Sequence, residues 1–250
     1  MDSQAEATAA ELIAAATRVF VLAGAGMSTE SGIPDFRGPH GLWTTNPAAQ
    51  RVFDIDAYMA DEHVRRVAWQ MRRSSPIIDA RPNAGHYALA SLAETGRTVT
   101  IATQNIDGLQ QMAGSAEVWE LHGTFWRARC LECGDLQGIE RVFARLDEGE
   151  VDPECRLCGG ILRTDTVAFG QSLDPEVLRA AGEAAANCDL ALAIGTSLAV
   201  FPAAGLCELA IDRGAAFVIV NGEPTAYDEL AAAVISDRIG SVLPRLVAGS

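Results

Sequence analysis

Two pairs of cysteines carry the clearest chemical signal in this sequence, because each pair has the C-x-x-C spacing of metal ligands. The pairs are Cys130 with Cys133 and Cys155 with Cys158, and 21 residues separate them. Two thiolates of each pair can contact one ion, and two pairs complete a tetrahedral zinc site that leaves no position for water. A redox-active pair is the alternative interpretation. We predict one structural zinc ion that takes no part in chemistry.

A glycine-rich turn follows a short apolar run, residues 19–22, that is typical of a buried parallel strand. Residues 23–26 read Ala-Gly-Ala-Gly, so a ligand can approach the backbone closely, and a helix start after such a turn suits a phosphate. A tight turn that binds nothing is the alternative. The next segment favours a binding site, because it places Asp35, Phe36 and Arg37 beside turn formers, a combination that core packing does not need.

Small or polar residues also follow three further predicted strands, at residues 99–103, 190–194 and 216–220. Because the carboxyl ends of parallel strands meet at one edge of an open sheet, we expect a dinucleotide crevice there. The first strand is followed by Gln104, Asn105 and Asp107, the second by Gly195, Thr196 and Ser197, and the third by Asn221 and Glu223. The glycine turn would contact the pyrophosphate, Asn221 or Glu223 an adenosine ribose, and Asn105 with Asp107 the far ribose and amide.

His122 is the candidate general base. It lies near the end of a predicted strand, residues 118–124, and Gly123 leaves its ring accessible. A histidine that only fills the core is the alternative. An imidazole beside a ribose suits a base that acts on a sugar hydroxyl, since its pKa is already near neutral. Hydride transfer is disfavoured, because Thr29 stands where the dehydrogenase fingerprint G-x-G-x-x-G has its third glycine.

The remaining pattern predicts an α/β fold, with a Rossmann-like doubly wound parallel sheet and a smaller second domain. Helices are expected at residues 1–17, 82–96, 174–187, 203–213, 226–234 and 241–247. Residues 39–81 lack strand signals and read as short helices and loops. We assign residues 1–37, 82–125 and 166–250 to the Rossmann-like domain. A helical lobe, residues 38–81, and a zinc ribbon, residues 126–165, would form the small domain.

The composition limits the partners and the compartment. The chain has 250 residues, 49% of them hydrophobic, which is ample for a core. A formal net charge of −14 argues against binding to a nucleic-acid backbone. We expect no membrane span, and the alanine-rich, acidic start does not resemble a secretory signal. These features, with cysteines expected to be reduced, indicate a cytoplasmic protein, and its oligomeric state stays open.

Together these motifs resemble those of the sirtuins, NAD-dependent protein deacylases. The matching segments are GAGMSTESGIPDFRG, TQNIDGLQ, LHGT, the two C-x-x-C pairs, FG, GTSLAVFP and IVNGEPT, in the family's order across about residues 19–225. The resemblance implies NAD and zinc, and an acyl-lysine peptide bound between the two domains. It implies deacetylation in which the acyl oxygen attacks the ribose C1′ as nicotinamide leaves, yielding free lysine peptide, nicotinamide and O-acetyl-ADP-ribose.

The resemblance also assigns roles to individual residues. His122 would be the general base, activating a ribose hydroxyl after nicotinamide has left, with Asn105 as a second catalytic residue. The expected NAD contacts are Ala23, Gly24, Ala25, Asp35, Phe36, Arg37, Gln104, Asn105, Asp107, Gly195, Thr196, Ser197, Asn221 and Glu223. Val167, Phe169 and Gly170 would lie along the peptide. The loop after Ile33 would fold over the cofactor.

Two departures from the family pattern bear on the substrate. Sirtuins that prefer succinyl or malonyl groups carry a Tyr-x-x-Arg pair, whereas here Trp69 stands three residues before Arg72, so we expect acetyl-lysine to be preferred. Gln171 replaces a glutamate of many relatives, which affects the expected peptide contacts. Two other functions stay open: a mono-ADP-ribosyltransferase that uses the same NAD site, and a non-catalytic NAD-sensing or peptide-binding module.

Overall fold

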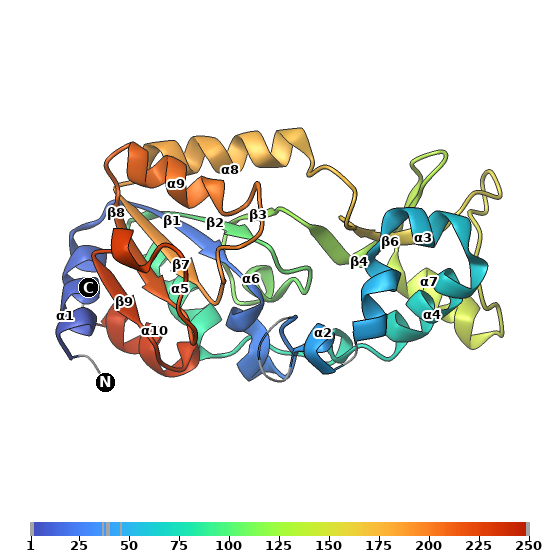
Figure 1. Ribbon diagram of the computed structural model, residues 1–250, viewed down its shortest axis with the longest axis horizontal. Coiled ribbons are helices and arrows are strands. Elements are labelled where there is room, and N and C mark those ends of the chain that lie inside the picture. The colour runs from blue at the N-terminus through green and yellow to red at the C-terminus, as the bar shows by residue number, and fades with distance from the viewer. Residues whose placement is uncertain (1–2, 37, 39–40, 46, 249–250) are drawn as a thin grey trace.

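The computed structural model describes residues 3–36, 38, 41–45 and 47–248, and Arg37 therefore lies outside the described residues. Figure 1 shows an elongated molecule with a helix-covered sheet at one end and a smaller body of short helices and strands at the other. The chain passes between these two parts more than once, so each part combines segments that are distant in the sequence.

The larger part is built on a six-stranded sheet in the order β3-β2-β1-β7-β8-β9, and every neighbouring pair is parallel. This is the order of a doubly wound nucleotide-binding sheet, with the reversal of strand order between β1 and β7. The expected fold class is confirmed. The strands are β1 (Arg18–Ala23), β2 (Thr98–Thr103), β3 (Glu117–Glu120), β7 (Leu190–Ile194), β8 (Ala216–Val220) and β9 (Ala233–Ile235).

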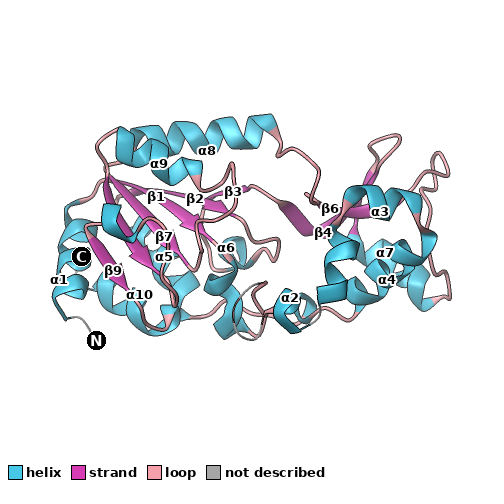
Figure 2. Cartoon of the chain, viewed as in Figure 1, coloured by secondary structure: helices cyan, strands magenta, loops and turns pink. Residues whose placement is uncertain are grey.

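Helices cover both faces of this sheet (Figure 2). Because successive strand residues face opposite sides, Val19 and Val21 of β1 pack with one group of helices while Phe20 and Leu22 pack with the other. The first face is covered by α1 (Ser3–Ala15), α5 (Ala84–Glu94) and α10 (Ile239–Ala248). The second is covered by α8 (Pro175–Asn187) and α9 (Gly205–Asp212).

The smaller part contains an antiparallel sheet in the order β5-β4-β6. Its strands are β4 (Gly123–Cys130), β5 (Leu136–Gly138) and β6 (Leu162–Thr166), with helix α7 (Ile139–Asp147). The helical lobe consists of α2 (Leu42–Thr45), α3 (Ile55–Ala60), α4 (Glu62–Arg73) and two 3₁₀ turns (Pro47–Phe53 and Pro76–Ile78). The Tyr58 hydroxyl donates to the Leu162 carbonyl at 2.8 Å and joins the lobe to this sheet.

Two element predictions need correction. The strand expected at residues 118–124 ends at Glu120, because Gly123, with φ 73°, turns the chain into β4 of the smaller sheet. The helix expected at residues 226–234 is wrong: a 3₁₀ turn (Asp228–Leu230) precedes β9. Ala233 and Ile235 are buried against the sheet edge, and this burial outweighs the helix propensity of the alanines.

A helix that spans a membrane must be long and continuously apolar, and the described helices of this protein differ from that pattern. Within the described ranges, none combines the length and the apolar character that a membrane span requires.

Candidate active site

The glycine-rich turn lies where β1 and β7 end side by side. Gly24 N–H donates to the Ile194 carbonyl and Gly26 N–H to the Gly195 carbonyl, both at 2.9 Å. A Cβ added to Gly24 would lie 2.5 Å from the Gly195 oxygen. These glycines are therefore needed for the close approach of two strand ends, and their N–H groups are already used within the protein.

Other N–H groups at this edge remain free for a ligand. Those of Ala25, Thr196 and Ser197 have no acceptor in the described part of the chain. The segment after Gly24 is a seven-residue 3₁₀ helix (Ala25–Ser31), closed by Gly32 with φ 86°. Two neighbouring turns thus present N–H donors at the point where the strand order reverses, the usual place for a nucleotide in such sheets.

Three polar side chains beside this turn form one hydrogen-bonded network. The Asn105 amide donates to the Gly24 carbonyl at 3.0 Å and to the Ser28 hydroxyl at 3.2 Å. The Ser28 hydroxyl in turn donates to the Asp107 carboxylate at 2.6 Å. The role of Ser28 could not be predicted, because a serine after a glycine turn gives no signal of a partner 79 positions away.

Asp107 is held on several sides. Its side chain also accepts from Leu109 N–H at 2.9 Å, at the start of the short helix α6 (Leu109–Met112), and its carbonyl accepts from the Trp126 indole at 2.7 Å. Burial raises the pKa of the Asp107 carboxyl, and the Ser28 and Leu109 hydrogen bonds oppose that rise. The network therefore fixes both Asn105 and Asp107 at the sheet edge.

His122 lies in the turn between β3 and β4, and its ring is oriented by the backbone of Gln104. The His122 Nδ1 atom lies 2.9 Å from the Gln104 carbonyl oxygen. Because a carbonyl only accepts, Nδ1 carries the proton and Nε2 has a free lone pair. Burial lowers the pKa of His122, and the Gln104 carbonyl partly offsets this. The neutral imidazole, with Nε2 as an acceptor, therefore predominates near neutral pH, as a general base requires.

Backbone hydrogen bonds join the segment expected along a peptide to His122 at one end and to the helical lobe farther along. Val167 N–H donates to the His122 carbonyl at 2.9 Å. Farther along, Phe169 N–H donates to the Phe53 carbonyl at 2.8 Å, and Ile55 N–H donates back to the Phe169 carbonyl at 3.2 Å. The Phe169 side chain is 48% exposed. The segment 167–170 thus runs from the histidine to the helical lobe and presents an exposed aromatic ring.

The side chain of Gln171 folds back onto this segment. Its side-chain oxygen accepts from Ala168 N–H at 2.9 Å and from the Arg163 guanidinium at 3.1 Å. The residue that departs from the sirtuin pattern therefore orders the turn after Phe169.

Several of the other predicted NAD contacts have partners of their own within the chain. The Asp35 carboxylate accepts from Gly38 N–H at 3.0 Å, and the Phe36 ring packs edge-on against Phe53, 6.0 Å between centroids. The Gln104 amide donates to the Thr196 hydroxyl at 2.9 Å, which joins two of the predicted strand ends. Ala23 is completely buried, so its side chain offers no ligand contact.

Asn221 and Glu223 stand apart from the Asn105 network. The Asn221 amide donates to the Glu223 carbonyl at 2.7 Å, which forms a separate polar turn at the end of β8.

The four predicted zinc ligands come together in the smaller part. All four Sγ atoms lie within 4.8 Å of one another, with Cys130 and Cys158 3.5 Å apart and Cys133 and Cys155 3.7 Å apart. Tetrahedral coordination with Zn–S bonds of about 2.3 Å places sulfurs about 3.8 Å apart, so this arrangement fits a Zn²⁺ ion. Because β4 separates His122 from Cys130, the cluster lies roughly 25 Å along the strand from the histidine.

The fold and this edge together define the class of protein: an α/β protein of the Rossmann type, with a nucleotide site at the switch point and a cysteine-rich second part. The chain belongs to the Sir2 family, whose model matches residues 24–202. It is 50% identical to the NAD-dependent protein deacetylase 2 of Streptomyces coelicolor, over 92% of this chain and 97% of that protein.

Solved structures agree with this assignment. One, from work on the mechanism and regulation of Sir2 enzymes, superposes with a TM-score of 0.90 at 37% identity and covers 100% of this chain and 98% of its own. A Sir2 complex with a p53 peptide and NAD⁺ gives a TM-score of 0.86 at 34% identity, with 95% of both chains covered.

Proposed function

We propose that this chain is an NAD-dependent protein-lysine deacetylase, which transfers the acetyl group of a lysine side chain to ADP-ribose and releases nicotinamide. Its family membership and the names of its relatives support this activity. The observation that carries the proposal is the neutral His122 ring, whose Nε2 is free while Nδ1 is fixed by Gln104 and the adjoining carbonyl is bonded to Val167.

In this proposal the predicted NAD residues other than Ala23 act at the sheet edge. Bound NAD supplies the ADP-ribose that accepts the acyl group. Asn105 and Asp107, held by Ser28, would contact the nicotinamide and its ribose, and Gln104 would position both His122 and Thr196. The free N–H groups of Ala25, Thr196 and Ser197 would meet the phosphates, with Gly24 and Gly195 allowing the close approach. Asn221 and Glu223 would contact the adenosine, and the segment 35–37 would cover the cofactor.

His122 would act on the ribose hydroxyl. Its Nε2 would accept the hydroxyl proton, and the Gln104 carbonyl would stabilise the imidazolium that forms, because Nδ1–H already donates to it. Loss of the proton makes the oxygen nucleophilic toward the acyl carbon. A neutral histidine before reaction is a requirement of this role, and its burial supplies it.

The peptide would bind along residues 167–170, between the Rossmann-like domain (residues 1–37, 82–125 and 166–250) and the small domain (residues 38–81 and 126–165). The backbone bonds from Val167 to His122 and from Phe169 to Phe53 place this segment between the base and the lobe. A zinc ion on the four cysteines would hold the ribbon. We place the enzyme in the cytoplasm, where such thiols stay reduced.

We further propose that acetyl-lysine is preferred over succinyl-lysine. Trp69, which stands in place of the tyrosine of succinyl-preferring relatives, is only 1% exposed, and its indole N–H has no partner among the described residues. Arg72 donates from Nε to the Thr164 hydroxyl at 3.2 Å and lies over the Phe53 ring. The tyrosine hydroxyl that would be the second donor to an acyl carboxylate is therefore missing beside this arginine, and the indole that replaces it is buried. Comparable turnover of matched acetyl and succinyl peptides would show this preference to be wrong.

A product analysis tests the activity itself. The enzyme is incubated with NAD and an acetyl-lysine peptide, and peptide, protein and solution are analysed by mass spectrometry. We expect deacetylated peptide with equal amounts of nicotinamide and O-acetyl-ADP-ribose, and no reaction with the same peptide lacking acetyl. ADP-ribose attached to protein, with the acetyl group retained, would instead identify a mono-ADP-ribosyltransferase.

A further inference from the structure

The segment expected to contact the peptide follows strand β6 and ends in a tight turn. In Figure 1 it lies on the connection from β6 to α8, between the two parts of the molecule. Gln171 N–H donates to the Ala168 carbonyl at 3.1 Å, and Gly170 has a φ of 87°, which favours glycine. The Gln171 side-chain oxygen accepts from Ala168 N–H at 2.9 Å. Gln171 therefore closes the turn twice, once with its backbone and once with its side chain.

Arg163 joins both ends of this segment. Its side chain is buried, and the residue is only 4% exposed. Its Nη1 donates to the Thr166 carbonyl at 2.6 Å and to the Gln171 side-chain oxygen at 3.1 Å, and its Nη2 donates to the Thr166 hydroxyl at 3.4 Å. The guanidinium also lies over the Tyr58 ring, 5.6 Å from its centre. One buried side chain thus holds the residue before the segment and the residue after it.

The hydrogen-bond acceptors of Arg163 are uncharged. Asp165, its closest acidic neighbour in the sequence, pairs instead with two arginines of β4, at 3.0 and 2.7 Å. Within the part of the chain that the structure describes, the guanidinium therefore relies on two oxygens of Thr166 and one of Gln171. A hydrogen bond from a charged donor is stronger than one between neutral groups, and its loss inside a protein costs more. The Gln171 oxygen is thus a required acceptor.

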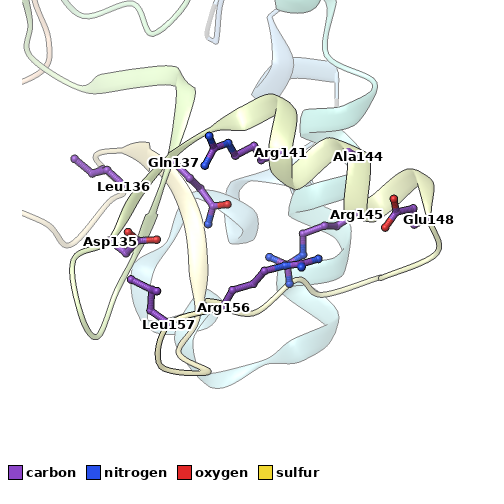
Figure 3. A pocket seen from close by; sticks show the side chains of 9 residues that line it. All are labelled: Asp135, Leu136, Gln137, Arg141, Ala144, Arg145, Glu148, Arg156 and Leu157. Carbon is purple, nitrogen blue, oxygen red and sulfur yellow. The ribbon is translucent and has the colours of Figure 1, made fainter.

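Arg163 differs in this respect from the arginines of the zinc ribbon. Figure 3 shows an open pocket beside β5 and α7 whose lining includes three arginines and two acidic side chains, namely Arg141, Arg145, Arg156, Asp135 and Glu148. There Arg145 also pairs with Glu150 at 2.7 Å. Carboxylates accompany the cations on that surface, whereas Arg163 is satisfied by the two ends of the peptide segment.

We propose that Arg163 and Gln171 are positioning residues for the acyl-lysine peptide. This inference rests on the proposed function, in which residues 167–170 contact the peptide. The two side chains would hold the segment in its binding shape beforehand, so that peptide binding does not have to order it. The side chain at position 171 must then supply an oxygen that accepts from Ala168 N–H and from Arg163 together. The glutamate of many relatives has such an oxygen, so Gln171 preserves this contact.

Peptide binding in the absence of NAD tests the proposal, by the fluorescence anisotropy of a labelled acetyl-lysine peptide with zinc-loaded protein. The peptide carries no charge beside the acetyl-lysine. Gln171→Leu has no acceptor, and we expect it to bind the peptide roughly fivefold or more weakly than the wild type. Gln171→Glu restores an oxygen and should bind within about twofold of the wild type. The matched control is Gln70→Leu, an exposed position on α4, which should leave the affinity unchanged.

Steady-state kinetics separates positioning from a general loss of folding. Gln171→Leu should raise KM for the peptide, while kcat and KM for NAD change by less than about twofold, because Val167 N–H keeps its bond to the His122 carbonyl. Partial unfolding would instead lower kcat and the melting temperature. Arg163→Met should resemble Gln171→Leu, but Arg163 is buried, so the exposed Gln171 gives the decisive variants.

Equal peptide affinity of Gln171→Leu and the wild type would overturn the proposal. A Gln171→Glu variant as weak as Gln171→Leu would also overturn it. Failure of the wild type to bind the peptide would overturn both this proposal and the proposed function. A wild type that binds the peptide without deacetylating it would contradict the proposed function alone, and the affinities of the variants would still decide the positioning role.

Discussion

The protonation state of His122 is the feature on which the proposed chemistry depends. Its Nδ1 is fixed by the Gln104 carbonyl, and burial lowers its pKa below that of an exposed histidine. The base form therefore persists to more acidic pH than usual. We expect the acidic limb of kcat/KM for deacetylation to fall below about pH 6.5, measured with a peptide that has no ionisable group in that range. A limb centred well above that value would contradict the assignment.

His86 should make stability depend on pH. It is completely buried in the capping box of α5, where Asn83 N–H donates to its Nδ1 at 3.2 Å, and burial lowers its pKa to about 4. The unfolded chain therefore binds a proton that the folded chain excludes, so stability is complete above about pH 6.5 and is lost as pH falls toward 4. His86 therefore has a structural role at the start of α5.

The corresponding measurement compares variants by chemical denaturation. Between pH 7 and 5, His86 should account for about 2 kcal/mol of the lost free energy of unfolding. The amide oxygen of His86→Gln can accept the same capping bond. Between pH 7 and 5, the free energy of unfolding of this variant should therefore fall by about 2 kcal/mol less than that of the wild type. The exposed His63→Gln on α4 is the control and should behave as the wild type. An equal loss in His86→Gln and wild type would refute the explanation.

At the scale of the elements, the close contact between the turn after β1 and the turn after β7 fixes the geometry of the proposed NAD site. A Cβ on Gly26 would lie 2.8 Å from the Gly195 Cα, a backbone atom that cannot move away without separating the strand ends. We expect Gly26→Ala to lower the free energy of unfolding by roughly 2 kcal/mol or more and to abolish NAD binding.

Gly182 offers the matched control. It lies inside helix α8, and a Cβ there would meet its nearest neighbours at 3.9 Å. Gly182→Ala should therefore stabilise the protein by up to about 1 kcal/mol, because alanine favours a helix. Thermal or urea unfolding measures the stability of both variants, and titration with NAD measures their affinity for the cofactor. Equal stability of Gly26→Ala and wild type would show that this contact is not tight.

Elements with strong local patterns could be predicted from the sequence, and those set by distant contacts could not. The buried strands at residues 190–194 and 216–220 matched because they are uniformly apolar. The short strand β9 was missed because its burial against β8, not its composition, decides its conformation. His122 was expected at a strand end and lies instead in the turn that leads to the other sheet, because Gly123 has a left-handed backbone conformation that a continuous strand does not allow.

The same distinction applies within the site. Polar residues at strand ends and the spacing of the cysteines indicated the region of each cluster. The hydrogen bonds that join distant segments within the site could not be predicted from the sequence. Ser28 to Asp107 and Val167 to His122 both join segments of different elements. The glycine turn was expected to contact the pyrophosphate, but the N–H groups of Gly24 and Gly26 already donate to carbonyls at the end of β7.

At the scale of the whole molecule, zinc should stabilise the smaller part. Cys130 and Cys155 belong to the core cluster that contains Trp69 and Val142, so loss of the ion would leave their two sulfur atoms without a partner inside this core and release the exposed Cys133 and Cys158. Removing zinc with a chelator should lower the melting temperature and reduce the near-ultraviolet circular dichroism of tryptophan. Metal analysis supplies the control: Cys133→Ser should lose zinc, whereas the buried, unclustered Cys207→Ala should retain it. An unchanged melting curve in metal-free protein would contradict the structural role.

The proposed order of events gives the most direct test of the whole account, because His122 acts only after nicotinamide has left. The measurement follows His122→Ala with NAD, isotope-labelled nicotinamide and an acetyl-lysine peptide. We predict that labelled nicotinamide still enters NAD in a peptide-dependent reaction, while release of deacetylated peptide is lost by roughly a hundredfold or more. Deacetylation by His122→Ala at the wild-type rate would contradict the account, and so would loss of the exchange in a variant that still binds NAD and peptide.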